Sequence, residues 1–235
     1  MLQEQITKMT ETTSLVPDIH LEDSPEEIPA VRLGAKLVSY LFHPLFIPAM
    51  ATAVLLWLHP LNKLLIADFS KPRIFAMVFL YTAFFPAVSV FLLWRLKFID
   101  SIFLRTRRER IIPFVIAMFF FFWIYYVSRN LETFPFSLKQ LLLGVFICSA
   151  SAMFANMYTK ISMHGIGVGG LVGFAFIQQF RDLNWNQNWS VIALLLAGVV
   201  CTARLILHAH KPVDVYAGFF TGVICQVAAS FMITP

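Results

Sequence analysis

Three ionisable residues near the C-terminal end of the chain have types and spacing suited to phosphoryl chemistry. Arg204, His210 and Asp214 follow one another at the junction of two apolar runs. A guanidinium can bind phosphate through two parallel hydrogen bonds, and a carboxylate four residues after a histidine can reach back and fix its tautomer. Because ionisable groups at the end of a membrane helix are costly, these residues are candidates for a functional site.

Two further groups upstream fit the same kind of site. Ser162 and His164 stand directly before a glycine-rich apolar run. A serine in this place predicts the N-cap of a helix, and a helix N-terminus is a binding site for anions. A cluster of arginines from Arg105 to Arg110 precedes another apolar run and is expected at its water edge.

Each group also has a plainer interpretation. His210 and Asp214 would by themselves form an ordinary structural pair, and an arginine cluster is most often an anchor or a topology signal at the membrane surface. His164, His208 and His210 can be viewed as a metal trio, but no carboxylate or cysteine completes a recognisable ligand set. With few carboxylates outside the N-terminal tail, we expect no metal at this site.

The composition predicts a membrane protein. The chain is 59% hydrophobic and 13% charged, which leaves too few charges to coat a soluble domain of 235 residues. We expect an all-α, polytopic membrane helix bundle with six or seven transmembrane helices, in which residues 1–33 form a polar, disordered tail and residues 34–235 the transmembrane domain. A spanning helix needs roughly 20 apolar residues. The candidate runs are 37–58, 74–96, 111–127, 138–158, 166–180, 189–207 and 213–233.

The distribution of charge bears on partners and on sidedness. The tail is acidic and the body basic, which suits anionic headgroups or a phosphate substrate and gives no indication of nucleic-acid binding. If all seven runs cross the membrane, the connections 97–110, 160–164 and 208–212 share one face with the N-terminal tail. That face carries more Lys and Arg, which by itself indicates the cytoplasm. Cations that bind substrate would not be topology signals, so the sidedness stays open.

The three groups, in this order, resemble the motifs of the type-2 phosphatidic acid phosphatase superfamily. The family's third motif, Ser-Arg-(five residues)-His-(three residues)-Asp, matches Arg204, His210 and Asp214. Its second motif, Pro-Ser-Gly-His, matches Ser162 and His164. The resemblance covers roughly residues 105–214.

The sequence departs from the family pattern at several positions. Ala203 replaces the serine of the third motif, and Ile161 and Met163 replace the proline and glycine of the second. The first motif, Lys-(six residues)-Arg-Pro, is degenerate, and its nearest equivalent is the arginine cluster that ends before Pro113. Met163 keeps its backbone amide available for phosphate but crowds the pocket.

The resemblance implies a metal-independent phosphoryl transfer that uses no cofactor. His210 would attack phosphorus and become phosphohistidine, oriented by Asp214, while His164 would protonate the leaving alkoxide and later activate water. The groups that would hold the phosphoryl oxygens are Arg204, Ser162, Arg110, Arg105 and the backbone amide of Met163. The substrate would be a membrane lipid phosphate monoester or pyrophosphate, met at the surface of the lipid bilayer. The expected location is the inner membrane of a bacterium, with the site pointing away from the cytoplasm as in most of the family.

Two other functions fit the same residues. A lipid phosphotransferase would form the same phosphohistidine and pass the group to an alcohol other than water. A catalytically inactive relative would bind lipid headgroups, an interpretation that the degenerate first motif and Met163 favour. The sequence leaves open the identity of the lipid and the oligomeric state.

Overall fold

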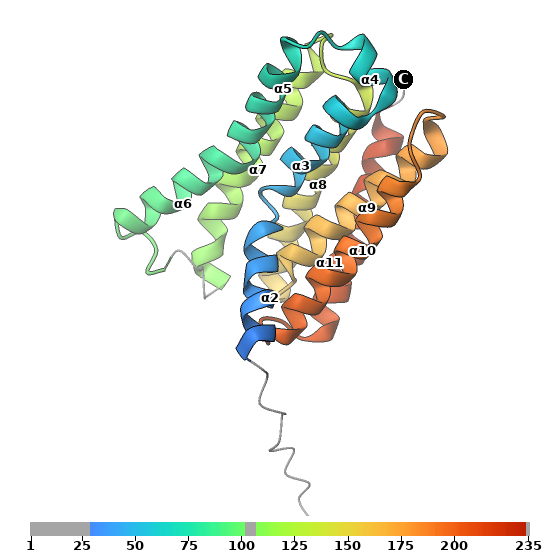
Figure 1. The fold of residues 1–235 in the computed structure, drawn as a ribbon. Helices are drawn as coiled ribbons and strands as arrows, with labels where there is room; N and C mark the ends of the chain where they lie inside the picture. The colour runs from blue at the N-terminus through green and yellow to red at the C-terminus, as the bar shows by residue number, and fades with distance from the viewer. Residues whose placement is uncertain (1–28, 102–106, 234–235) are drawn as a thin grey trace, which may run out of the picture.

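A computed structural model of the chain describes residues 29–101 and 107–233, and within these ranges the structure is all-helical, without a strand (Figure 1). This confirms the predicted all-α class. The predicted phosphate ligand Arg105 lies outside the described residues. The helical elements are α2 (Pro29–Leu41), α3 (Ile47–Ala53), η2 (Val54–Leu58), α4 (Pro60–Leu65), α5 (Ser70–Phe79), η3 (Leu80–Phe84), α6 (Phe85–Arg95), α7 (Arg107–Arg129), α8 (Phe136–Tyr158), α9 (Met163–Arg181), α10 (Asn188–Ile206) and α11 (Pro212–Met232).

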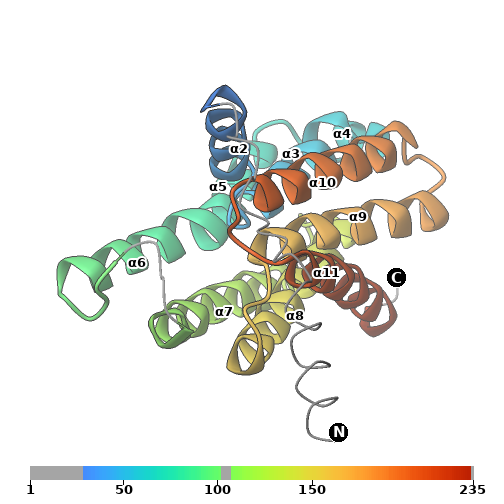
Figure 2. The same cartoon turned by 90° about the horizontal axis from the view of Figure 1, so that it is seen from below.

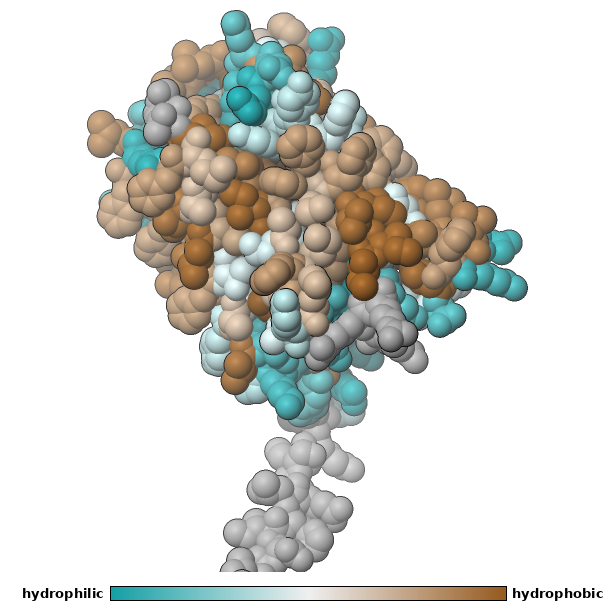
Figure 3. All heavy atoms as spheres, turned by 180° about the vertical axis from the view of Figure 1, so that it is seen from behind, coloured by the Kyte–Doolittle hydropathy of each residue, from teal (hydrophilic) through white to brown (hydrophobic). Residues whose placement is uncertain are grey.

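Five helical stretches are long and apolar enough to span a bilayer, which makes the chain an integral membrane protein. Large apolar side chains cover their outer surfaces: Leu195 is 65% exposed and Phe231 74%. Figure 3 shows a mostly apolar surface between hydrophilic regions at the two ends of the molecule. The five stretches are Ser70–Arg95, Glu109–Arg129, Phe136–Tyr158, Asn188–Ile206 and Pro212–Met232.

The predicted number of six or seven spans is therefore not confirmed, and the two missing runs differ from the others for physical reasons. The run 37–58 is broken at residues 42–46, because Pro44 lacks a backbone N–H and disfavours helical geometry in the preceding residue. Helix α9 contains five glycines and the polar residues Gln178 and Gln179, so it is less apolar than its neighbours. It packs against α8, α10 and α11 in the middle of the bundle (Figure 2).

Glycines allow α9 and α11 to approach at backbone contact. A Cβ atom added at Gly165 would lie 2.7 Å from the carbonyl oxygen of Val215, and one at Gly218 would lie 2.6 Å from that of Ser162. Added Cβ atoms at Gly169 and Gly222 would also meet backbone atoms of the facing helix. Small residues at this spacing allow membrane helices to come close.

The helix connections gather at two ends of the bundle (Figure 1). The start of α2 and the connections 159–162 and 207–211 lie at one end, called the site end below. Helix α4 and the connections 130–135 and 182–187 lie at the opposite end. This arrangement agrees with the grouping that the sequence predicted for helices crossing in alternation.

Candidate functional site

Five of the predicted site residues line one cavity near the site end. The cavity has a volume of about 470 Å³ and is lined by Arg110, Met163, His164, Arg204 and His210. These side chains come from α7, α9, α10 and the connection that leads into α11, which are distant in sequence. The cavity therefore brings two imidazoles and two guanidinium groups around one space.

The ring of His210 is held by the backbone of the connection 159–162, between α8 and α9. Its Nδ1 lies 2.9 Å from the carbonyl oxygen of Lys160. Because a carbonyl can only accept, Nδ1 must carry the proton, and in the neutral ring Nε2 is left with the free lone pair. The ring thus has the tautomer that a nucleophile at Nε2 requires.

The carboxylate of Asp214 has a different role from the predicted one. The sequence predicted that it would fix the ring of His210, but the carbonyl of Lys160 occupies that place. Asp214 instead accepts a hydrogen bond from the backbone N–H of Lys211 at 3.3 Å, in a capping box at the start of α11. It stabilises the helix that follows the histidine rather than the ring itself.

The surroundings of His210 keep its ring neutral. Burial lowers the pKa of His210 to about 4, and the positive charge of Arg204 contributes in the same direction. Desolvation disfavours the charged form of an imidazole, and a nearby cation disfavours it further. At neutral pH the ring is therefore uncharged.

Ser39 of α2 joins the second imidazole to the guanidinium of Arg204. The Nε2 atom of His164 lies 3.0 Å from the carbonyl oxygen of Ser39, so Nε2–H donates and Nδ1 holds the lone pair. The hydroxyl of the same serine accepts a hydrogen bond from Nη1 of Arg204 at 3.4 Å. Sequence reasoning missed Ser39, since a single serine in a helix carries no motif.

Arg204 keeps a donor for a ligand. It lies in the last turn of α10, and its Nε atom is buried without a hydrogen-bond partner within the described part of the chain. A buried unsatisfied donor is costly, and an anion bound beside it would remove that cost. Arg204 thus has an unsatisfied donor on a side chain that lines the cavity.

The predicted residues of the second motif divide into two roles. Ser162 is the N-cap of α9, as predicted, and its hydroxyl accepts from the backbone N–H of Gly165 at 3.2 Å. It is 0% exposed, and its own N–H donates to the carbonyl of Asp214 at 3.1 Å, so it fastens the start of α9 to that of α11. Its hydroxyl thus lacks the open surface that contact with phosphate requires, whereas Met163 lines the cavity.

His43 is a cavity residue that sequence reasoning did not assign. It lies in the break between α2 and α3, and its ring centroid is 5.4 Å from that of His164 in a T-shaped arrangement. The signal was a titratable residue followed by Pro44 inside an apolar run, a combination that membrane helices rarely carry without a purpose.

One wall of the cavity is apolar. It is built by α6 and α7, which lie beside the polar residues described above. Such a wall suits hydrocarbon rather than water. Its residues are Pro86, Ala87, Val90, Phe91, Pro113, Phe114, Ala117 and Phe121.

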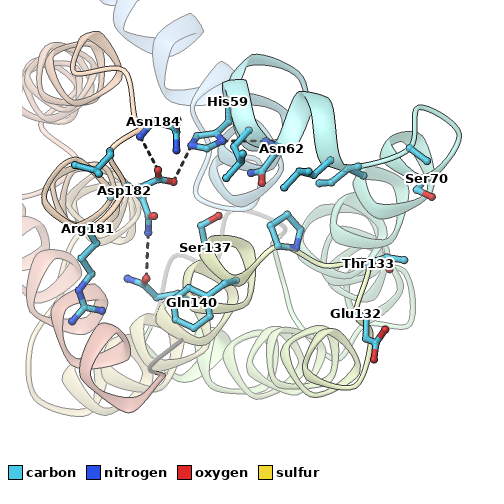
Figure 4. Close-up of a pocket in the computed structure, with 18 of the residues that line it drawn as sticks. His59, Asn62, Ser70, Glu132, Thr133, Ser137, Gln140, Arg181, Asp182 and Asn184 are labelled. Carbon is cyan, nitrogen blue, oxygen red and sulfur yellow. Dashed lines mark hydrogen bonds and ion pairs between the residues drawn. The ribbon is translucent and has the colours of Figure 1, made fainter.

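A second, larger cavity of about 900 Å³ lies at the opposite end (Figure 4). Three of its titratable side chains, those of His59, Asp182 and Arg181, have protein partners. Nε2 of His59 lies 2.9 Å from Oδ2 of Asp182, and the guanidinium of Arg181 donates to the carbonyl of Ser230 at 2.8 Å. The first contact joins the residue before α4 to the connection 182–187, and the second joins α9 to the end of α11, so both hold this end of the bundle together.

The contact between His59 and Asp182 gives a prediction about stability. Nδ1 of His59 accepts from the N–H of Asn62, so Nε2 carries the proton; it lies 2.9 Å from Oδ2 of Asp182 in a close electrostatic contact that lacks the alignment of a hydrogen bond. Replacing Asp182 by alanine leaves this proton in a side chain that is only 3% exposed, which we expect to cost about 1–3 kcal/mol of stability. Thermal unfolding in detergent measures the loss. Asp182→Asn, which keeps an acceptor oxygen, should lose less, and equal losses in the two variants would contradict this account.

The described residues offer no ligand set for the metal site that the three histidines suggested. In residues 29–101 and 107–233, no group of three or more His, Cys, Asp or Glu side chains is placed to hold a metal ion. His164 and His210 of the suggested trio each have one ring nitrogen within hydrogen-bonding distance of a backbone carbonyl.

The site therefore consists of a neutral imidazole with a defined tautomer, a second imidazole, two guanidinium groups and an apolar wall. Together these groups can bind a phosphate ester and carry out nucleophilic and acid–base chemistry on it. In comparisons with known proteins, the chain matches no family model, no curated protein and no solved structure.

Proposed function

We propose that the chain is a membrane phosphatase that hydrolyses a lipid phosphate monoester or pyrophosphate through a phosphohistidine, without a metal ion. One observation carries the proposal: His210, neutral and protonated on Nδ1, shares a cavity with His164, Arg204 and Arg110. A nucleophile, a proton donor and two binding groups for phosphoryl oxygens are the parts that this reaction needs.

In the first step, Nε2 of His210 attacks phosphorus, and the bond from phosphorus to the alcohol oxygen breaks. The negative charge of the bound phosphate favours the protonated form of His164, which gives a proton from Nδ1 to the leaving oxygen while its Nε2–H stays bonded to the carbonyl of Ser39. Arg204 and Arg110 stabilise the charge that builds on the phosphoryl oxygens. The carbonyl of Lys160 accepts from Nδ1–H of the phosphorylated ring.

In the second step, water replaces the histidine on phosphorus. His164, now neutral, takes a proton from the attacking water, and the bond between Nε2 of His210 and phosphorus breaks. Inorganic phosphate leaves and both imidazoles return to their starting protonation states. His164 thus acts as the proton donor in the first step and as the proton acceptor in the second, while His210 is first the nucleophile and then the leaving group.

The apolar wall supports a lipid as the substrate. The phosphate would occupy the polar part of the cavity while hydrocarbon lies along α6 and α7. A site near the end of a membrane bundle allows a headgroup to enter while its chains stay in the bilayer. The proposed location is the inner membrane of a bacterium, an assignment that rests on the resemblance to the type-2 phosphatidic acid phosphatases.

The decisive experiment measures phosphate release by detergent-purified protein. The panel contains phosphatidate, phosphatidylglycerophosphate and a polyprenyl pyrophosphate, with EDTA present throughout. We expect release of free phosphate from at least one lipid. Transfer to an added alcohol without free phosphate would indicate the phosphotransferase, and headgroup binding without turnover would indicate the inactive relative.

The lowered pKa of His210 gives a prediction about pH. With a pKa of about 4, the ring stays neutral as the pH falls from 7 to 5 and becomes protonated only below that range. NMR titration of histidine-labelled protein, with the signal assigned by its loss in His210→Asn, should show a midpoint near 4. Replacing Arg204 by methionine removes a cation, so the midpoint should move upward. A midpoint near the ordinary value of about 6.5 in the unaltered protein would show that the ring is fully hydrated.

A further inference from the structure

We infer that His43, which lies outside every motif of the resemblance, is a further ligand of the substrate's phosphoryl group and donates a hydrogen bond from Nε2. The inference rests on the proposed function and adds to it a residue that recognises the phosphoryl group. The first support is position. His43 lines the same cavity as Arg204 and His210, with its ring centroid 5.4 Å from that of His164.

The hydrogen bonding of the ring determines which nitrogen can donate. The backbone N–H of Leu45 donates to Nδ1 of His43 at 3.4 Å, a long hydrogen bond. An accepting Nδ1 holds the lone pair, so the neutral ring carries its proton on Nε2. His43 therefore offers an N–H from the side of the ring away from Leu45.

The interruption between α2 and α3 places the ring of His43 in the cavity. The residue before a proline avoids helical geometry, so Pro44 stops α2 from continuing through His43. The N–H of Phe46 then donates to the carbonyl of His43 at 2.8 Å, which closes a turn before α3 begins. The turn leaves the ring of His43 beside His164, in the cavity that Arg204 also lines, rather than within an uninterrupted apolar helix.

The composition of the site explains why another donor is needed there. The family pattern begins with a lysine that this chain lacks, and Ser162 is buried as an N-cap. Arg204 and Arg110 already place two positive charges around the cavity. A lysine added beside them would be repelled, whereas a neutral imidazole N–H can bind a phosphoryl oxygen without adding charge.

Three substitutions of His43 test whether its side chain binds the phosphoryl group or only packs against its neighbours. The side-chain amide of glutamine can place an N–H where Nε2 of His43 stands, the amide of asparagine is too short to do so, and phenylalanine keeps only the ring. We expect His43→Phe and His43→Asn to weaken orthovanadate binding and to lower kcat/KM by roughly 10- to 100-fold, as for a lost hydrogen bond to a charged group. His43→Gln should stay close to the unaltered protein.

Orthovanadate, a mimic of the phosphoryl group, is the probe, and vanadium NMR of the full-length protein in detergent reports its binding without turnover. Gel filtration and thermal unfolding check that each variant is folded, and the near-isosteric pair Gln and Asn keeps the test valid if phenylalanine disturbs packing. Unchanged vanadate affinity and kcat/KM in His43→Phe would overturn the inference, and so would equal losses in the Gln and Asn variants.

The unaltered protein separates this inference from the proposed function. If it binds vanadate in a manner that depends on His43 but releases no phosphate from any lipid, the inference stands and the phosphatase proposal fails. If it releases phosphate while the His43 variants behave like the unaltered protein, the phosphatase proposal stands and the inference fails. If the unaltered protein neither binds vanadate nor releases phosphate, both fail.

Discussion

Replacement of His210 by asparagine is expected to lower the turnover number for lipid phosphate by about 10⁴- to 10⁶-fold, the loss seen when a covalent nucleophile is removed. The asparagine amide can still donate to the carbonyl of Lys160 from the place of Nδ1, which preserves the contact that holds the connection. It has no atom at the place of Nε2, so no bond to phosphorus can form. The substitution therefore removes the nucleophile and leaves its support.

The measurement has a kinetic and a chemical part. Phosphate release gives the turnover number, and quenching protein mixed with radiolabelled substrate in alkaline detergent preserves the phosphohistidine, which is labile to acid and stable to base. The label should be present in the unaltered protein and absent in His210→Asn. A labelled His210→Asn variant, or one with unchanged turnover, would move the nucleophile to another residue.

Replacement of His164 by glutamine is expected to have the next largest effect, a loss of about 10²- to 10⁴-fold in turnover of lipid phosphates, the usual contribution of a general acid–base group. The glutamine amide can still donate to the carbonyl of Ser39 from the place of Nε2, so the link between α9 and α2 is kept. It cannot give a proton to a leaving alkoxide or take one from water.

The dependence on the leaving group distinguishes acid catalysis from loss of structure. An alkoxide needs protonation as it leaves, whereas p-nitrophenolate is stable without it. The first step of p-nitrophenyl phosphate hydrolysis, followed as the burst of nitrophenolate, should therefore slow much less in His164→Gln than the corresponding step with a lipid. Equal losses for both substrates would assign His164 to positioning rather than to proton transfer.

The sequence predicted most of the long apolar helices and the gathering of three motif residues, because both follow from residue type. Apolar runs predict membrane helices, and Ser162 before a glycine-rich run predicts the N-cap that the structure contains. Arg204, His164 and His210 share a cavity as the order of the motifs led us to expect. The break at residues 42–46 was signalled by Pro44 and Pro48.

The partners of the two imidazoles could not be predicted from the sequence. Both rings donate to backbone carbonyls, those of Lys160 and Ser39. Every residue carries a carbonyl, so no residue type marks the one that will face a ring after folding. The carboxylate of Asp214 was the only visible partner for His210, and in the structure it caps α11 instead. The proposed role of His43 could not be predicted from the sequence for the same reason, since its neighbours come from distant segments.

The position of Ser39 has a consequence for any shortened form of the chain. A protein that began at α3 would still contain every residue of the three motifs, and a motif search would score it as intact. It would nevertheless lack the backbone oxygen that orients His164 and the hydroxyl that contacts Arg204. We expect such a fragment to lose the fixed orientation of the proposed phosphate-binding groups. Helix α2 would then belong to the minimal functional unit, although it contains no residue of the three motifs.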